Sequence, residues 1–177
     1  SDDWINNGGN FINTNHIHES IHDPHLSIFE KNLFTDGWFV KSMPDLNQKN
    51  ELLETYLIQN SIWWIEYANL SGFRVDTYPY VDKHFLSAWS MRISSEYPNF
   101  NFVGEEWNDN PTIVSYWQKD SPRHDDYVSF IPSMMDFPLQ SAIVKGLKEK
   151  ESWNSGIGNI FRVLANDFQY GNPYNLV

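Results

Sequence analysis

Two short stretches of the chain end apolar runs with charged side chains. GFRVD carries Arg74 and Asp76, and VGEEW carries Glu105 followed by Trp107. Two carboxyl groups can cleave a glycosidic bond if one stays ionised and the other holds a proton for the leaving oxygen. Arg74 would lower the pKa of Asp76, whereas apolar surroundings and a second negative charge would raise the pKa of Glu105.

Both stretches have the pattern of short strands with polar residues at their carboxyl ends. Side chains alternate between the two faces of a strand, so Arg74 and Asp76 share one face, while Glu105 and Glu106 point to opposite faces. Parallel α/β folds carry their chemistry at the carboxyl ends of strands. Spacing alone also fits a structural Arg–Asp pair beside solvated glutamates.

Helical and strand patterns alternate after residue 47, which predicts parallel strands joined by crossover helices and therefore an α/β fold. Residues 1–47 are polar and read as loop-rich with one short helix. Asn47 could cap the first long helix. The expected helices cover residues 48–70, 81–97, 110–119, 137–150 and 156–168, and the expected strands cover 72–76, 99–107, 126–130 and 174–177.

Composition narrows the classes of function. The chain has 177 residues and a formal net charge of −11, which disfavours nucleic acid and anionic membranes as partners and suits a neutral substrate. It contains eight Trp, some of which could act as flat platforms for a ligand with apolar faces. It contains no Cys, so disulfides and thiol chemistry are excluded. We predict no membrane span and no signal peptide, and composition does not indicate the cellular compartment.

The segment HIHESIHDPH gathers four histidines, which form either a metal site or an ordinary surface loop. Their spacing fits no familiar zinc pattern, so we predict no metal site here. The residues concerned are His16, His18, His22 and His25.

Three ordered motifs together resemble the alpha-amylase family of glycoside hydrolases (family 13). In that family Gly-Phe-Arg-x-Asp ends the fourth barrel strand and Gly-Glu-x-Trp ends the fifth; here Glu105 follows Asp76 by 29 residues (105 minus 76). MPDLN, residues 43–47, resembles the signature that ends the family's inserted domain B. Its first residue, Met43, is like the neopullulanase and cyclomaltodextrinase branch.

The resemblance implies a partial (βα)8 TIM barrel. Residues 1–47 would be the end of the loop-rich domain B, and residues 48–177 would run from about barrel helix 3 to the start of strand 7. The family's motifs at strands 3 and 7, including a third essential Asp, would lie outside this chain. We therefore expect the piece alone to be inactive, with open strand edges that the rest of the barrel or a partner copy in a homodimer would cover.

Carried over by motif, the resemblance makes Asp76 the nucleophile, Glu105 the acid/base and Arg74 the residue that orients Asp76. The implied mechanism is retaining, with the carboxyl groups roughly 5–5.5 Å apart. Trp107 would line the sugar subsites. Many family members carry Lys-His where this chain has Pro79 and Tyr80, so the leaving-group sites would differ.

Tyr80 would either stack on a sugar ring or fill space. Asp45 and Asn47, within the third motif, would shape the domain junction rather than touch substrate.

The first hypothesis is thus that the chain is part of a hydrolase of starch-type alpha-glucans such as pullulan, cyclodextrins and maltodextrins. A non-catalytic carbohydrate-binding or scaffold relative is the alternative from another class, and an alpha-glucan transglycosylase or isomerase is the alternative within enzymes. The mechanism needs no cofactor. The resemblance allows calcium in a full-length protein, but no ligand set here is convincing. A periplasmic or extracellular location rests on the resemblance alone.

Overall fold

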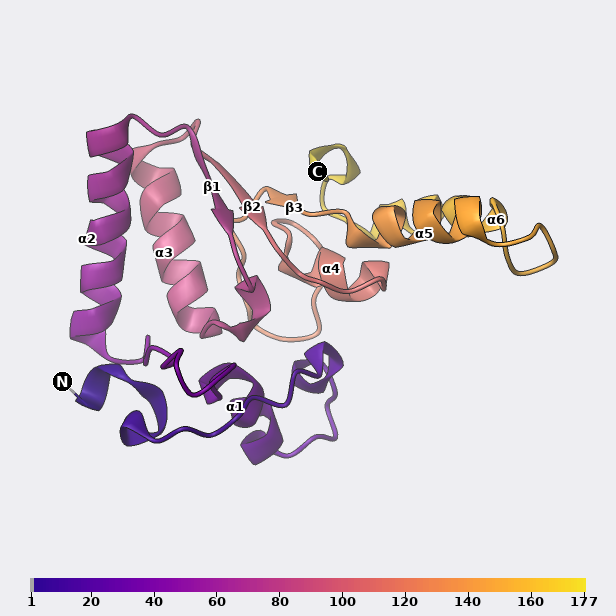
Figure 1. Ribbon diagram of the computed structural model, residues 1–177. Coiled ribbons are helices and arrows are strands. Elements are labelled where there is room, and N and C mark those ends of the chain that lie inside the picture. Colours follow the sequence, from indigo (N-terminus) through magenta and orange to yellow (C-terminus); the bar gives the residue numbers. More distant parts are fainter. Residues whose placement is uncertain (1) are drawn as a thin grey trace. The chain divides into compact units, whose positions relative to one another are not determined.

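The computed structural model describes residues 2–177, which form two compact units whose elements are labelled in Figure 1. The first unit comprises the chain up to residue 71 together with residues 78–100. The second unit comprises residues 72–77 and 101–177. The polypeptide therefore enters the second unit briefly, returns to the first, and then completes the second.

The amino-terminal part of the first unit is rich in loops, as the sequence predicted. Its only α-helix among residues 2–47 is α1, Ile28–Asp36. Ser27 caps this helix, because its Oγ accepts a hydrogen bond from the backbone N–H of Glu30 at 3.2 Å. The other turns are 3-10 helices, namely η1 (Asp2–Trp4), η2 (Asn6–Gly9) and η3 (His18–Ile21). A fourth, η4 (Tyr78–Tyr80), precedes the second long helix of the unit.

Two long helices, α2 (Glu51–Ala68) and α3 (Lys83–Glu96), complete the first unit. The cap of α2 is Asn50, whose Oδ1 accepts hydrogen bonds from the N–H groups of Leu52 and Leu53 at 3.1 Å. The prediction of Asn47 as the cap was wrong because helical geometry begins three residues later. Asn47 instead donates through Nδ2 to the carbonyl of Asp3 at 3.1 Å.

The two long helices pack against each other along apolar faces. On α3 the buried side chains recur about every four residues, which is the helical period that places Phe85, Trp89 and Ile93 on one face. The indole Nε1 of Trp89 donates to Ser61 Oγ on α2 at 2.9 Å. This hydrogen bond satisfies the polar edge of a Trp that is otherwise in the core.

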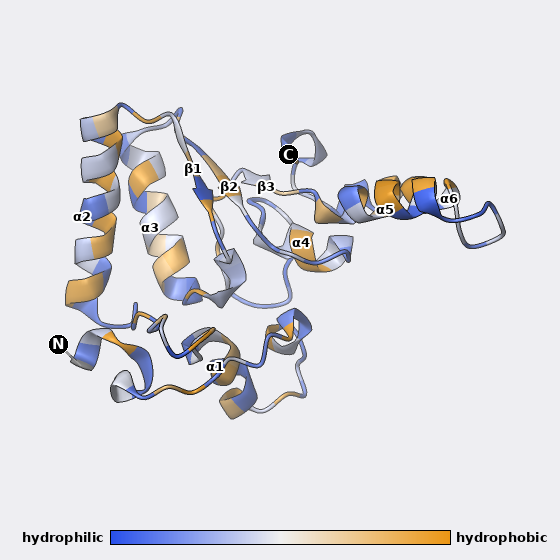
Figure 2. Ribbon diagram, viewed as in Figure 1, coloured by the Kyte–Doolittle hydropathy of each residue, from blue (hydrophilic) through white to orange (hydrophobic). Residues whose placement is uncertain are grey.

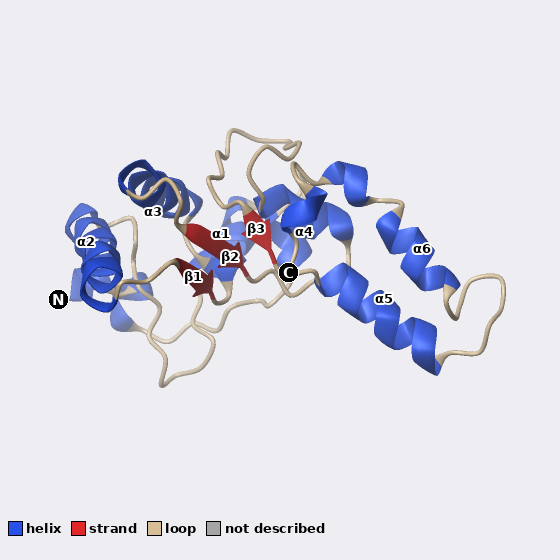
Figure 3. Cartoon of the chain, turned by 90° about the horizontal axis from the view of Figure 1, so that it is seen from above, coloured by secondary structure: helices blue, strands red, loops and turns tan. Residues whose placement is uncertain are grey.

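The second unit is built on three parallel strands in the order β1-β2-β3, seen side by side in Figure 3. β1 covers Gly72–Val75, β2 covers Asn101–Gly104 and β3 covers Ser133–Met134. Val75 pairs with Gly104, and Gly104 pairs with Met134. This register ends all three strands at the same edge of the sheet, where the sequence predicted the polar residues.

The predicted strand at residues 126–130 was wrong, because β3 lies farther along the chain. Residues 126–130 run beside α4 (Pro111–Trp117) instead: Tyr127 stacks on Tyr116 with 5.6 Å between ring centroids, and Ser129 Oγ donates to the Trp117 carbonyl at 2.5 Å. Alternate residues of this segment are buried because they pack against α4. A strand would show the same alternation, which is why the pattern was misleading.

The helices α5 (Phe137–Lys148) and α6 (Gly158–Leu164) pack against each other, and Figure 2 shows α5 with mixed apolar and polar faces. The predicted helix at 156–168 is shorter than expected, and the 3-10 helices η5 (Asp167–Gln169) and η6 (Pro173–Asn175) follow it. The predicted strand at 174–177 was wrong, because η6 occupies its first half and Leu176 forms an isolated parallel bridge with Met134.

None of the helices in the described part of the chain combines the length and apolar character that a membrane crossing requires.

Asp45 is a half-buried carboxyl group of the first unit. It accepts a hydrogen bond from Asn6 Nδ2 at 2.7 Å, and its backbone carbonyl accepts one from the Asn6 N–H at 2.9 Å. Burial raises the pKa of Asp45 to about 6, although the hydrogen bond from Asn6 opposes this. Because the folded state favours the protonated form, Asp45 stabilises the fold at low pH and loses that contribution as the pH rises through about 6.

Asp45→Asn should raise the free energy of unfolding at pH 7 by about 1–3 kcal/mol, because no charge then has to be buried. At pH 4 the variant and the unmodified protein should be equally stable. Urea denaturation of the full-length protein at both pH values measures this, with Asp126→Asn at an exposed position as the control. A variant that is less stable at pH 7 would contradict the account.

Candidate active site

Arg74 lies between two carboxyl groups at the carboxyl edge of the sheet. Its Nη1 is 3.1 Å from Asp76 Oδ1, and its Nη2 is 2.5 Å from Glu105 Oε1. The structure thus brings together three of the side chains that the sequence singled out, two from the end of β1 and one from the end of β2. The side chain of Asp76 is 69% exposed and that of Glu105 is 9% exposed, so only one of the two carboxyl groups is open to solvent.

The backbone at the ends of β1 and β2 fixes this arrangement. The N–H of Glu105 donates to the carbonyl of Val75 at 3.0 Å, which extends the strand pairing by one residue. The chain then turns at Thr77, whose φ of 47° lies in the left-handed region that β-branched residues rarely adopt. This turn directs the Thr77 N–H to Glu105 Oε2 at 3.0 Å. Both oxygens of Glu105 are therefore held by donors.

Thr77 was not identified from the sequence. Its contribution is a backbone N–H rather than a side chain, so residue type gives no signal. A β-branched residue directly after the end of the strand gives no hint of positive φ, since Gly and Asn are the usual residues there.

The environment shifts the two pKa values in opposite directions. The hydrogen bond with Glu105 is the main cause that lowers the pKa of Asp76, and the charge of Arg74 and the N–H of Thr77 add to it. Burial is the main cause that raises the pKa of Glu105, and the neighbouring Asp76 adds to it, while Thr77 and Arg74 oppose it. Of the two groups, Asp76 is thus the one that loses its proton more readily, and Glu105 is the one that keeps its proton to higher pH.

The causes differ in part from those expected. Sequence analysis predicted that Arg74 would lower the pKa of Asp76. Arg74 does lower it, but the hydrogen bond with Glu105 contributes more. Sequence analysis expected apolar surroundings and a second negative charge to raise the pKa of Glu105, and its burial is indeed the main cause, with Asp76 adding to it.

Glu106 points away from this pair. It is fully buried, and its Oε2 accepts a hydrogen bond from the indole Nε1 of Trp117 on α4 at 2.9 Å. Consecutive glutamates therefore serve opposite sides of the strand end, as the predicted alternation requires.

Trp107 is 73% exposed and stacks on Phe137, the first residue of α5. The ring centroids are 5.3 Å apart and the planes differ by 16°. Phe137 was missed by sequence analysis. The available signal was its position just after the third parallel strand, but that strand was predicted in the wrong place.

Tyr80 belongs to the first unit and is only 9% exposed. Its ring stacks on Phe34 with centroids 4.1 Å apart, and its hydroxyl lies 3.2 Å from His18 Nε2. Since Phe34 covers one face of the ring and little surface remains open, the structure favours the space-filling alternative over stacking on a sugar.

The histidine-rich segment supplies partners for this aromatic cluster. His16 stacks on Phe39, and His18 contacts Tyr80. No group of three or more potential metal-ligating His, Asp or Glu side chains occurs among residues 2–177.

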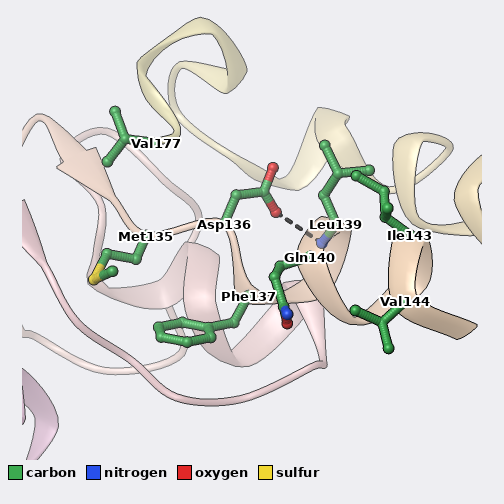
Figure 4. Close-up of a pocket in the computed structure, with 8 residues that line it drawn as sticks. All are labelled: Met135, Asp136, Phe137, Leu139, Gln140, Ile143, Val144 and Val177. Carbon is green, nitrogen blue, oxygen red and sulfur yellow. Dashed lines mark hydrogen bonds between the residues drawn. The ribbon is translucent and has the colours of Figure 1, made fainter.

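An open groove of about 400 Å³ lies in the second unit, along α5 (Figure 4). Its lining is mainly apolar, and Asp136 and Gln140 are its polar members. Arg74, Asp76 and Glu105 do not line it. Its full lining consists of Met135, Asp136, Phe137, Leu139, Gln140, Ile143, Val144 and Val177.

The model of the family "Alpha amylase, catalytic domain" matches residues 29–157. A cyclomaltodextrinase from Thermoanaerobacter pseudethanolicus is 29% identical over 102 residues, which cover 58% of this chain and 16% of the relative. An intracellular maltogenic amylase from Bacillus subtilis is 31% identical over 70 residues, which cover 40% of this chain and 12% of the relative. The matched segments thus span less than a fifth of the length of these curated relatives.

The structure of an Anoxybacillus alpha-amylase superposes with a TM-score of 0.71 at 23% identity, over 98% of this chain and 33% of that one. This likeness shows the fold: the α/β arrangement is that of part of a (βα)8 barrel.

Arg74→Met should raise the pKa values of both Asp76 and Glu105, because the guanidinium lowers each of them. Carboxyl ¹³C NMR titration of the full-length protein measures both groups. Arg92→Met, which removes the exposed pair with Glu96 on α3, is the matched control and should leave both values unchanged. A Glu105 that titrates below Asp76 in the unmodified protein would contradict the assignment.

Proposed function

The chain belongs to the alpha-amylase family of glycoside hydrolases, and we propose that it supplies the nucleophile and the acid/base of a retaining alpha-glucan hydrolase. Asp76 is the nucleophile, Glu105 is the acid/base, and Arg74 orients Asp76. The observation that carries this proposal is the pair of carboxyl groups bridged by Arg74, with a lowered pKa at Asp76 and a raised pKa at Glu105.

In the first step, the ionised Asp76 attacks the anomeric carbon of the sugar. The bond from that carbon to the glycosidic oxygen breaks, and the departing oxygen takes the proton of Glu105. The burial of Glu105 supports its role as the acid, because burial keeps the carboxyl group protonated until the leaving oxygen needs the proton.

In the second step, Glu105 is ionised and takes a proton from water while the water oxygen attacks the anomeric carbon. The bond to Asp76 breaks, which releases the sugar with its original configuration. Arg74 and the Thr77 N–H stabilise the ionised Glu105 at this stage, since both already contact its oxygens.

Substrate entry must bring the glycosidic oxygen within reach of the proton of Glu105. The retaining geometry needs roughly 5–5.5 Å between the two carboxyl groups. Arg74 and the Thr77 N–H keep Glu105 in place as the glycosidic oxygen approaches, since both contact its oxygens.

The substrates are neutral starch-type alpha-glucans, namely cyclodextrins, maltodextrins and pullulan. The names of the two curated relatives, a cyclomaltodextrinase and a maltogenic amylase, support this class. The net charge of −11 is compatible with an uncharged substrate. Trp107, exposed beside the acid, is the side chain that stacks on a sugar ring.

Residues 1–47 form the end of an inserted, loop-rich domain B, and residues 48–177 form the barrel from about helix 3 to the start of strand 7. A third carboxylate, supplied by the rest of the barrel, completes the site, so the 177-residue piece alone is inactive. We assign no metal or cofactor to this chain. Calcium and a homodimer are properties to be sought in the full-length enzyme.

In the full-length protein, Asp76→Asn and Glu105→Gln should each reduce kcat/KM on cyclodextrin and pullulan by roughly 10²–10⁴-fold or more. Glu106→Gln is the matched control: it lies next to the acid but faces Trp117, and it should retain activity. NMR of the first product should show the α-anomer. Binding of these sugars without cleavage would contradict the proposal and favour a non-catalytic relative, and the β-anomer would contradict the retaining mechanism.

A further inference from the structure

The exposed indole of Trp107 stacks on the ring of Phe137, the first residue of α5. We infer that Phe137 is a positioning residue, which sets the plane of Trp107 and thereby the sugar-stacking surface beside Glu105. The inference rests on the proposed function, because it names how that same site holds an alpha-glucan chain.

The loop that carries Trp107 is held on both sides. The N–H of Asn108 donates to the Glu106 carbonyl at 2.9 Å, and Asn110 caps α4 by accepting from Thr112 N–H at 3.0 Å. Asp109 forms an ion pair with Lys145 of α5 at 2.9 Å. The remaining freedom of Trp107 therefore lies in its own side-chain torsions.

Phe137 restricts those torsions by stacking on one face of the indole. The nearly parallel planes and the 5.3 Å centroid separation place this contact within the range of favourable aromatic pairs. Phe137 can cover only one face, and Trp107 remains 73% exposed, so the indole keeps open surface for a ligand. A sugar ring that stacks there meets a platform already oriented, which reduces the entropy cost of binding.

Phe137 is itself well anchored. It is the first residue of α5, where Asp136 Oδ1 accepts a hydrogen bond from the Leu139 N–H at 2.9 Å, drawn in Figure 4. Its own N–H donates to the Met135 carbonyl at 3.0 Å. The three parallel strands thus each deliver one part: the first leads to Asp76, the second to Glu105, and the third to Phe137.

The nearby groove along α5 does not offer an equivalent surface. Apart from Phe137, its apolar lining is aliphatic, as Figure 4 shows for Met135, Leu139, Ile143 and Val144. These side chains provide no flat ring for the face of a sugar. The stacking function therefore belongs to Trp107 with Phe137 behind it.

The test measures binding of maltoheptaose by titration calorimetry in the full-length protein that carries Glu105→Gln, so that substrate is not consumed. Phe137→Leu should raise Kd about 3–10-fold, and Phe137→Tyr should restore it, because the ring is retained. In a Trp107→Leu background, Phe137→Leu should have no further effect, since there is no indole left to orient. Phe161→Leu, at an exposed position on α6, is the control.

In the active enzyme, Phe137→Leu should raise KM by a similar factor and leave kcat within about twofold, because the carboxyl pair is untouched. An unchanged Kd, or an equal loss of affinity with and without Trp107, would overturn the inference. A protein that binds maltoheptaose but never cleaves it would overturn only the proposed function. A protein that does not bind the sugar at all would overturn both.

Discussion

The position of Arg74 between Asp76 and Glu105 is the interaction on which the site depends. Two neighbouring carboxyl groups repel each other when both are ionised, so the pair needs a nearby cation or a proton on one of them. The guanidinium fork contacts both groups at once, 3.1 Å from one and 2.5 Å from the other. Its reach requires β1 and β2 to be parallel neighbours in the observed register, with their carboxyl ends level.

Unequal burial then gives the two carboxyl groups different chemistry. Asp76 is exposed beside a cation, which favours its ionised form, whereas the burial of Glu105 favours its protonated form. The strained turn at Thr77 provides a backbone N–H that donates to Glu105 and partly offsets the rise in its pKa. The same strand end buries Glu106 on the other side, against Trp117, so one pair of adjacent glutamates serves both the site and the core.

Sequence reasoning predicted the features that depend on periodicity and motif. The alternation of faces along two strands separated Glu105 from Glu106, and helix-strand alternation indicated the parallel sheet. It failed where tertiary packing overrides a local pattern. Tyr127 and its neighbours alternate in burial because they pack against α4. This alternation led to a strand being predicted in the wrong place, so the position of Phe137 just after β3 was missed. Thr77 acts through a backbone N–H, which residue type does not reveal.

The most direct test of the central claim is to trap the covalent intermediate on Asp76. Full-length protein with Glu105→Gln would be incubated with α-maltosyl fluoride, whose leaving group needs no proton, and the peptides would be mapped by mass spectrometry. The account predicts that the peptide containing Asp76 gains one maltosyl group, because the variant lacks the base that would release it. Hydrolysis of the fluoride with Asp76 unmodified, or a label on another carboxyl group, would contradict it.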